Sequence, residues 1–157
     1  MGNYQNIEAE FISRTIRLID QYYNDLNKFP FEEQYNYTLT LNCLLGLIVM
    51  PKERVVAYIP PLRITENLKN EIGLELSELS PDIQTLRDLI HRLRHSIAHF
   101  DINIVSEDNQ NRIDFIEFID SQNNEVVVAK FKSQELLPFL KYYSSCLLEN
   151  LERYREN

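Results

Sequence analysis

Positive charge is scarce in this sequence, because 16 lysine and arginine residues stand against 24 aspartate and glutamate residues among 157. The formal net charge of −8 argues against a general nucleic-acid binder, which neutralises many phosphates with a broad basic surface. The same charge argues against adhesion to an anionic membrane. Any contact with a polyanion therefore has to come from positive charge gathered at one place.

Cysteine is also scarce, and neither of the two cysteines lies in a metal-binding motif. Cys43 and Cys146 stand in apolar helical segments far apart in the sequence, without CxxC or Cys/His spacing. We expect free, buried thiols in a reducing compartment. Residues 1–8 have neither the basic nor the apolar region of a secretory signal, so a cytoplasmic location is predicted. The longest apolar run, residues 39–50, is shorter than the roughly 20 residues of a membrane span and predicts a buried helix.

Apolar residues recur at helical spacing in several segments. One helix is expected over residues 11–26, and a second over about 32–49. Residues 51–81 contain four of the six prolines and predict a long connection. Within this connection a short helix is expected near 66–72, with Gly73 behind it.

Two further helices have clear apolar stripes. Ser80, Pro81 and Asp82 form a helix-start pattern, with a capping hydroxyl, a proline in the first turn and an early acid. The apolar seam of this helix has spacings of 3 and 4 residues in alternation, which suits packing against other helices. The seam residues are Ile83, Leu86, Ile90, Leu93, Ile97 and Phe100. Ser133 is expected to cap a last helix. Its stripe consists of Leu136, Leu140, Tyr143, Leu147 and Leu151.

Between these two helices the pattern changes to short β-prone runs. The runs are residues 102–105, 112–119 and 125–131. Turn-rich residues at 106–111 and 121–124 separate them. The pattern predicts a small antiparallel β-meander before the C-terminal helix, and the predicted fold class is mainly α.

The histidines and arginines of one helix form a candidate site. All three histidines of the sequence fall within nine residues: His91, His95 and His99. The arginines of the same segment are Arg87, Arg92 and Arg94, against a single acid, Asp88. On a helix, Arg87, His91 and Arg94 follow one row beside the apolar seam, and the other two histidines form the next row. A basic, histidine-bearing stripe of this kind suits contact with a phosphate and a partner protein.

Residues 94–99, Arg-His-Ser-Ile-Ala-His, resemble the R-x4-H motif of the HEPN (higher eukaryotes and prokaryotes nucleotide-binding) family. That motif usually has a polar residue directly after the arginine, which is His95 here. Residues 37–54 are similar to a subgroup of HEPN proteins borne on plasmids and other mobile elements. The resemblance implies a HEPN-like helical bundle, and we expect one domain over residues 1–157 with the β-meander inserted at about 102–131.

The resemblance also implies a metal-independent endoribonuclease, often a toxin or defence protein, that acts as a homodimer through the helix of the motif. RNA supplies its own nucleophile, the 2′-hydroxyl. A histidine can take or give the proton near neutral pH, and an arginine can hold the phosphate with a planar fork of donors. We therefore expect catalytic roles for Arg94, His99 and His95, and binding roles for His91, Arg87 and Ser96. No metal or other cofactor is expected, and the expected partners are RNA and an antitoxin or other neutralising protein.

Ordinary structural roles are an alternative for the same residues. His99 and Arg94 can be a helix-capping histidine and a surface arginine, both favoured by the helix dipole. Residues i and i+5 are about 140° apart on an ideal helix, so the two side chains converge only if the helix ends or bends near His99, or across a dimer. A metal site of the three histidines is a weaker alternative. The alternative function is a non-catalytic HEPN module that binds nucleotide or RNA, or that only dimerises.

Overall fold

The computed structural model describes residues 3–51, 53–107, 113–123 and 126–155. Within these ranges the chain forms six α-helices and one four-stranded sheet. The helices are α1 (Ile7–Asp25), α2 (Asn36–Val49), α3 (Glu53–Ala57), α4 (Glu66–Glu71), α5 (Leu86–Ala98) and α6 (Leu136–Arg155). The strands are β1 (Glu78–Leu79), β2 (Ile102–Val105), β3 (Phe115–Asp120) and β4 (Val126–Lys132).

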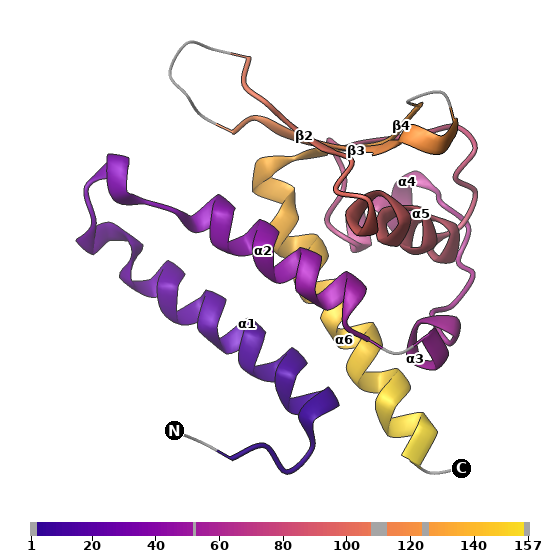
Figure 1. Ribbon diagram of the computed structural model, residues 1–157, viewed down its shortest axis with the longest axis horizontal. Coiled ribbons are helices and arrows are strands. Elements are labelled where there is room, and N and C mark those ends of the chain that lie inside the picture. Colours follow the sequence, from indigo (N-terminus) through magenta and orange to yellow (C-terminus); the bar gives the residue numbers. More distant parts are fainter. Residues whose placement is uncertain (1–2, 52, 108–112, 124–125, 156–157) are drawn as a thin grey trace.

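The helices and the sheet form two parts that share one core (Figure 1). Helices α1 and α2 run antiparallel side by side, and α6 packs against both. The sheet lies across one end of the helices, with α5 packed against β3 and β4. This arrangement confirms the predicted mainly-α bundle with an antiparallel sheet before the last helix. None of the described helices is both long and apolar enough to span a membrane.

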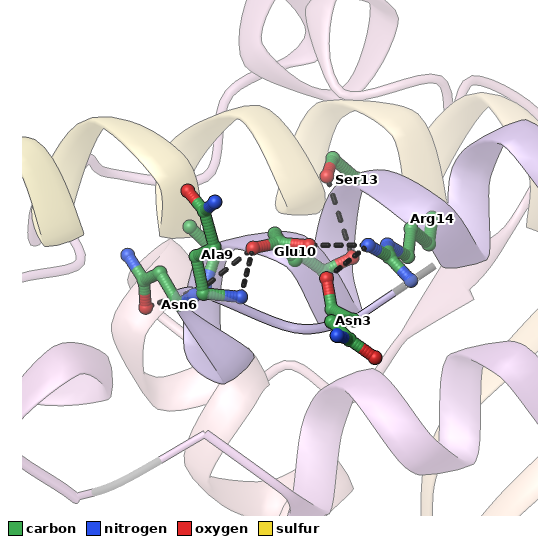
Figure 2. A network of polar contacts seen from close by, with 7 residues as sticks. Asn3, Asn6, Ala9, Glu10, Ser13 and Arg14 are labelled. Carbon is green, nitrogen blue, oxygen red and sulfur yellow. Dashed lines mark hydrogen bonds and ion pairs between the residues drawn. The ribbon is translucent and has the colours of Figure 1, made fainter. Parts of the chain in front are cut away.

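Polar contacts at its N-terminus start α1 at Ile7, four residues before the predicted position (Figure 2). The Asn6 side chain accepts a hydrogen bond from the Ala9 N–H. The Glu10 carboxylate accepts two backbone N–H groups that precede the helix, at 2.7 and 2.9 Å, and pairs with Arg14. These contacts satisfy N–H groups that have no partner within a helix, so the helix extends beyond the apolar stripe on which the prediction rested.

Other helix boundaries also differ from the prediction. α2 begins at Asn36 rather than at about 32, because Phe31–Glu33 closes a separate 3₁₀ turn. The helix α3 lies in the stretch predicted as a connection. Ser133 begins the 3₁₀ turn Ser133–Glu135, which leads into α6, so the residue does not cap α6 directly.

The helix with the three histidines, α5, begins at Leu86, so the predicted start at Ser80 is wrong. Thr85 and Asp88 form a capping box in which each side chain accepts a hydrogen bond from the backbone N–H of the other, at 3.1 and 3.0 Å. The N–H of Ser80 instead donates to a carbonyl of β4 at 2.9 Å, which continues the pairing of β1 with β4. Ser80, which the sequence pattern places at a helix start, therefore continues the sheet instead.

The sheet has the strand order β1-β4-β3-β2, and all neighbours are antiparallel. Strand β2 covers the predicted residues 102–105, and β3 and β4 extend one residue beyond the predicted C-terminal ends. Residues 112 and 125, at which two of the predicted strands begin, lie outside the described residues. The sequence does not predict β1, because an edge strand of two residues has no alternating pattern.

The core extends from α1 and α2 through α5 and α6 to the sheet. The apolar stripe predicted for the last helix is buried throughout. Phe118 of β3, Phe131 of β4 and Phe139 of α6 meet edge to face, with ring centroids 5.3 and 5.1 Å apart. The seam predicted for α5 is buried from Ile83 to Ile97, but the Phe100 side chain is 78% exposed. The seam prediction is wrong at Phe100, because α5 ends before this residue.

Candidate functional site

His95 and His99 meet at the C-terminal end of α5. Their ring centroids lie 4.6 Å apart and the ring planes are tilted by 57°. Side chains four residues apart share one face of a helix, which brings His99, the C-cap residue, next to His95. His99 is exposed and His95 is half-buried, so a ligand can reach the pair from the His99 side. Two adjacent imidazoles at the surface are suited to taking and giving protons near neutral pH.

Asp120, the last residue of β3, provides a carboxylate beside His95. Its Oδ1 lies 3.8 Å from Nε2 of His95, and its Oδ2 lies 3.6 Å from Nη1 of Arg92. Oδ1 is buried and has no hydrogen-bond partner in the part of the chain that the structure describes. A small rotation of either side chain would bring Oδ1 within hydrogen-bond distance of the ring, so Asp120 can orient His95 and balance its charge when it is protonated.

An open pocket of about 400 Å³ lies on the same side of α5. Its lining consists of Asp82, Asp88, His91, Arg92, His95 and Asp120. Three carboxylates against one arginine give this pocket a charge that disfavours a phosphate unless the histidines are protonated. The exposed edge of His99, which lies outside the pocket lining, is therefore the better place for a phosphate.

Arg94 extends toward the end of α2. Its Nη1 donates a hydrogen bond to the carbonyl of Ile48 and lies 3.4 Å from the carbonyl of Pro51. The last carbonyls of a helix carry partial negative charge, so a guanidinium is a favourable cap there. Arg94 thus holds the end of α2 and is half-buried, while His95 and His99 lie toward the end of β3.

The three predicted binding residues have different surroundings. His91 is exposed and lines the pocket. The Nε of Arg87 donates to the carbonyl of Ile59 at 2.9 Å, which ties α5 to the end of the α3 segment. Ser96 is fully buried, and its hydroxyl donates to the Arg92 carbonyl at 3.2 Å. Of the three, His91 has the most surface available to a ligand.

The chain leaves α5 through a turn centred on Phe100. The N–H of Phe100 donates to the Ile97 carbonyl at 3.0 Å, and the N–H of Asp101 donates to the Ser96 carbonyl at 2.8 Å. This pair of bonds is the Schellman motif, which places the residue after the C-cap in the left-handed region. Phe100 accordingly has φ of 58°. The turn ends α5 directly after the histidine pair and leads into β2.

Metal-binding and thiol chemistry find little support in the described ranges. No group of three or more histidine, cysteine, aspartate or glutamate side chains is placed there to hold a metal ion. Cys43 and Cys146 are free and half-buried. Burial raises the pKa of both thiols, so neither is activated as a thiolate nucleophile.

Two residues of this site were missed by sequence reasoning. Asp120 stands at the end of a strand, 25 positions after His95, and only the packing of β3 against α5 brings the two together. A lone aspartate in a turn-rich stretch gives no signal of its own. Phe100 continues the predicted apolar seam, although its position just before the β-prone residues 102–105 is a signal that the helix ends there and the residue leaves the seam.

Comparison with known protein families gives a match over nearly the whole chain. The family model described as HEPN pEK499 p136, a HEPN family of plasmid-borne origin, matches residues 1–154. The chain belongs to this HEPN family. No curated protein and no solved structure gives a significant match. The match confirms the predicted HEPN family and agrees with a mainly-α HEPN fold. HEPN families include ribonucleases, and HEPN domains commonly dimerise and bind RNA.

Proposed function

We propose that this HEPN protein is a metal-independent endoribonuclease that cleaves single-stranded RNA as a toxin or defence protein. The observation that supports the proposal most directly is the contact between His95 and His99 at the exposed end of α5. Membership of a HEPN family supports it as well, because HEPN families include ribonucleases. A net charge of −8 is compatible with such an enzyme, since the histidine pair needs to hold only one phosphate.

In the proposed reaction the 2′-oxygen of one nucleotide attacks the neighbouring phosphorus, and the bond to the 5′-oxygen of the next nucleotide breaks. His99 takes the proton from the 2′-hydroxyl, and protonated His95 gives a proton to the leaving 5′-oxygen. The products are a 2′,3′-cyclic phosphate and a 5′-hydroxyl, so the step consumes neither water nor an oxidant. Asp120, whose Oδ1 lies 3.8 Å from Nε2 of His95, is suited to orient the His95 ring.

Arg94 is proposed to act on the phosphate across a homodimer formed through α5. Arg94 extends to the end of α2 and the histidine pair lies toward β3, so the partner copy is the better source of the arginine at each site. In a two-fold dimer each guanidinium would add positive charge to the phosphate at the other His99. Ala98 is small and exposed, which allows two copies of α5 to approach closely. A neutralising protein would act by covering this end of α5.

The test is cleavage of single-stranded RNA of varied sequence by the purified protein in excess chelator. Loss of a general acid–base group lowers rates by about 100-fold or more, so His99→Ala is expected to have at least this effect. Removal of a charge that stabilises the transition state has a similar size, and Arg94→Ala is expected to lower the rate by about 100-fold. Mass spectrometry of the products should show the cyclic phosphate.

Two controls separate catalysis from folding. Arg94→Lys keeps the positive charge at position 94, and Arg153→Ala removes an exposed arginine of α6. The melting temperatures of all variants show whether the loss of Arg94 from the end of α2 destabilises the fold. Wild-type protein that cleaves none of the RNAs, or normal cleavage by both His99→Ala and Arg94→Ala, contradicts the proposal.

One observation favours a second function, a non-catalytic HEPN module that binds RNA or only dimerises. Arg94 donates to backbone carbonyls of the α2 end, which is a sufficient structural reason for an arginine at this position. This alternative predicts RNA binding or dimerisation without turnover of any RNA. It also predicts that Arg94→Ala lowers the melting temperature and leaves RNA binding unchanged.

A further inference from the structure

Phe100 occupies a backbone conformation that a phenylalanine disfavours. Among the described residues it is the only one other than glycine with positive φ, at 58°. A side chain with a Cβ is strained in the left-handed region, and bulky residues there are rare. Such strain is found most often where a side chain serves a function.

The end of α4 closes with the same turn and shows which residue type this turn favours. The N–H of Gly73 donates to the Asn70 carbonyl at 3.2 Å, and the N–H of Leu74 donates to the Lys69 carbonyl at 2.8 Å. These are the two bonds that close α5, and the central residue there is glycine with φ of 76°. A glycine at position 100 would therefore close α5 without strain. The hydrogen bonds of the turn explain the positive φ but not the phenylalanine.

Core packing does not explain the phenylalanine either. The Phe100 side chain is 78% exposed, whereas the rings of Phe118, Phe131 and Phe139 are fully buried. Its neighbours in the chain, His99 and Asp101, are polar. The phenylalanine side chain therefore strains the backbone and does not contribute to the hydrophobic core.

The position of the ring indicates a ligand. Ala98, His99 and Phe100 are three consecutive exposed residues, and neighbouring Cα atoms lie only about 3.8 Å apart. A strand of RNA extends on both sides of a phosphate at His99, so its bases can reach the Phe100 ring. Single-stranded RNA combines a phosphate with a flat base, and unpaired bases stack on exposed aromatic side chains.

We propose that Phe100 stacks on an unpaired nucleobase beside the phosphate held at His99, and so restricts the substrate to single-stranded RNA. This inference rests on the proposed function, because it places the phosphate at His99. A paired base is already stacked in its helix and cannot cover the ring, so double-stranded RNA gains nothing from Phe100. The hydrogen bonds of the turn fix the backbone of Phe100, which reduces the entropy lost on binding.

The probe for the test is a short single-stranded RNA that cannot be cleaved, because every 2′-hydroxyl is methylated. It carries one fluorescent 2-aminopurine, moved along the strand from one oligonucleotide to the next. Wild-type protein is expected to quench 2-aminopurine at one position. Stacking on one aromatic ring changes affinity by about 10-fold, so Phe100→Leu is expected to raise Kd by about this factor and to remove the quenching. Phe100→Trp keeps an aromatic ring in the same strained turn and is expected to retain both.

Leucine and tryptophan are matched controls, since both have a Cβ at positive φ and only one is aromatic. If Phe100→Leu and wild type have equal Kd and equal quenching while wild type cleaves unmodified RNA, the stacking inference is wrong and the proposed ribonuclease still stands. Quenching through Phe100 without cleavage of unmodified RNA overturns the proposed ribonuclease and supports the stacking. Absence of binding to the probe overturns the inference, whereas the ribonuclease is decided by cleavage of unmodified RNA. Light scattering that shows dissociation of a wild-type dimer on Phe100→Leu assigns the ring to a contact between copies, and also overturns the inference.

Discussion

The ends of α4 and α5 close with the same pair of hydrogen bonds, but Gly73 is at the centre of the first turn and Phe100 at the centre of the second. The first turn is packed, because a Cβ built on Gly73 would lie 2.4 Å from the Cβ of Pro138. The second is open to solvent. Packing leaves room only for glycine at the first turn. At the second turn the side chain is exposed, so packing does not restrict the residue type, and a phenylalanine occupies a left-handed conformation that is unfavourable for it. A helix end at which the central side chain is exposed is thus free to present a residue that folding does not require.

The largest effect is expected from Gly73→Ala. The new Cβ meets Pro138 at an impossible distance and the backbone N of Phe139 at 3.2 Å, and alanine is also strained at φ of 76°. Overpacking and left-handed strain together should lower the free energy of unfolding by at least about 3 kcal/mol. Urea denaturation measures the loss. A loss below about 1 kcal/mol would show that α6 moves easily away from this turn, and the contrast between a packed and an open turn would not hold.

The second largest effect is expected from Glu135→Ala, which removes hydrogen bonds to the residues that follow Gly73. The buried Glu135 accepts hydrogen bonds from the Leu76 N–H at 2.8 Å and the Ser77 hydroxyl at 2.6 Å. Glu135→Ala leaves both donors without this carboxylate, and a loss of about 2 kcal/mol in unfolding free energy is expected. Asp101→Ala is the matched change at the open turn, where the carboxylate accepts from the exposed Ser121 hydroxyl. It should cost well under about 1 kcal/mol. Equal losses for the two variants would contradict the comparison.

The same two turns show why the sequence predicts some of the fold and misses the rest. Gly73 is a local signal, because glycine behind a short helix marks a left-handed turn, and the structure confirms it there. Phe100 continues the spacing of a buried seam, so its residue type indicates the core. Only the helix end after Ala98 places it in solvent, and that end depends on pairing of the following residues with β3. Periodicity identifies a stripe well, whereas the point at which a helix stops is set by tertiary contacts.

The candidate site likewise has contacts that the sequence predicts and contacts that it does not. The sequence places His91, His95 and His99 on one helix, and spacing of four correctly brings the last two together. It does not show that Arg94 reaches the end of α2 or that Asp120 reaches His95, because both contacts join segments far apart in the chain. Long-range partners of a side chain depend on how the helices and the sheet pack, and a single sequence has no local pattern for them.

A smaller effect, of opposite sign, is expected from Phe100→Gly. Glycine relieves the strain at positive φ, and no core contact is lost, because the ring is exposed. The unfolded chain becomes more flexible, which offsets part of the gain. The net result should be a rise of about 1 kcal/mol in unfolding free energy, measured in urea against the loss expected for Gly73→Ala. RNA affinity should fall at the same time. A variant less stable than wild type would mean that the ring does stabilise the fold, and Phe100 would then resemble Gly73 as a structural residue.

The smallest effect is expected at the start of α1, where the polar contacts of Glu10 are exposed or only partly buried. It tests the assumption that such contacts at helix ends contribute little. Hydrogen bonds from the backbone N–H groups of Asn6 and Gln5 hold the pKa of the Glu10 carboxyl below its ordinary value (Figure 2). Because the pKa is lower in the folded protein, the stabilisation is complete above the pKa of the unfolded chain and is lost as the pH falls through the folded value. Glu10→Gln should therefore lower Tm slightly at pH 7, and its difference from wild type should shrink as the pH falls below the ordinary pKa of a glutamate. A difference that is constant with pH would assign the effect to lost packing of the side chain, and one as large as that of Glu135→Ala would show that an open helix end can matter as much as a packed one.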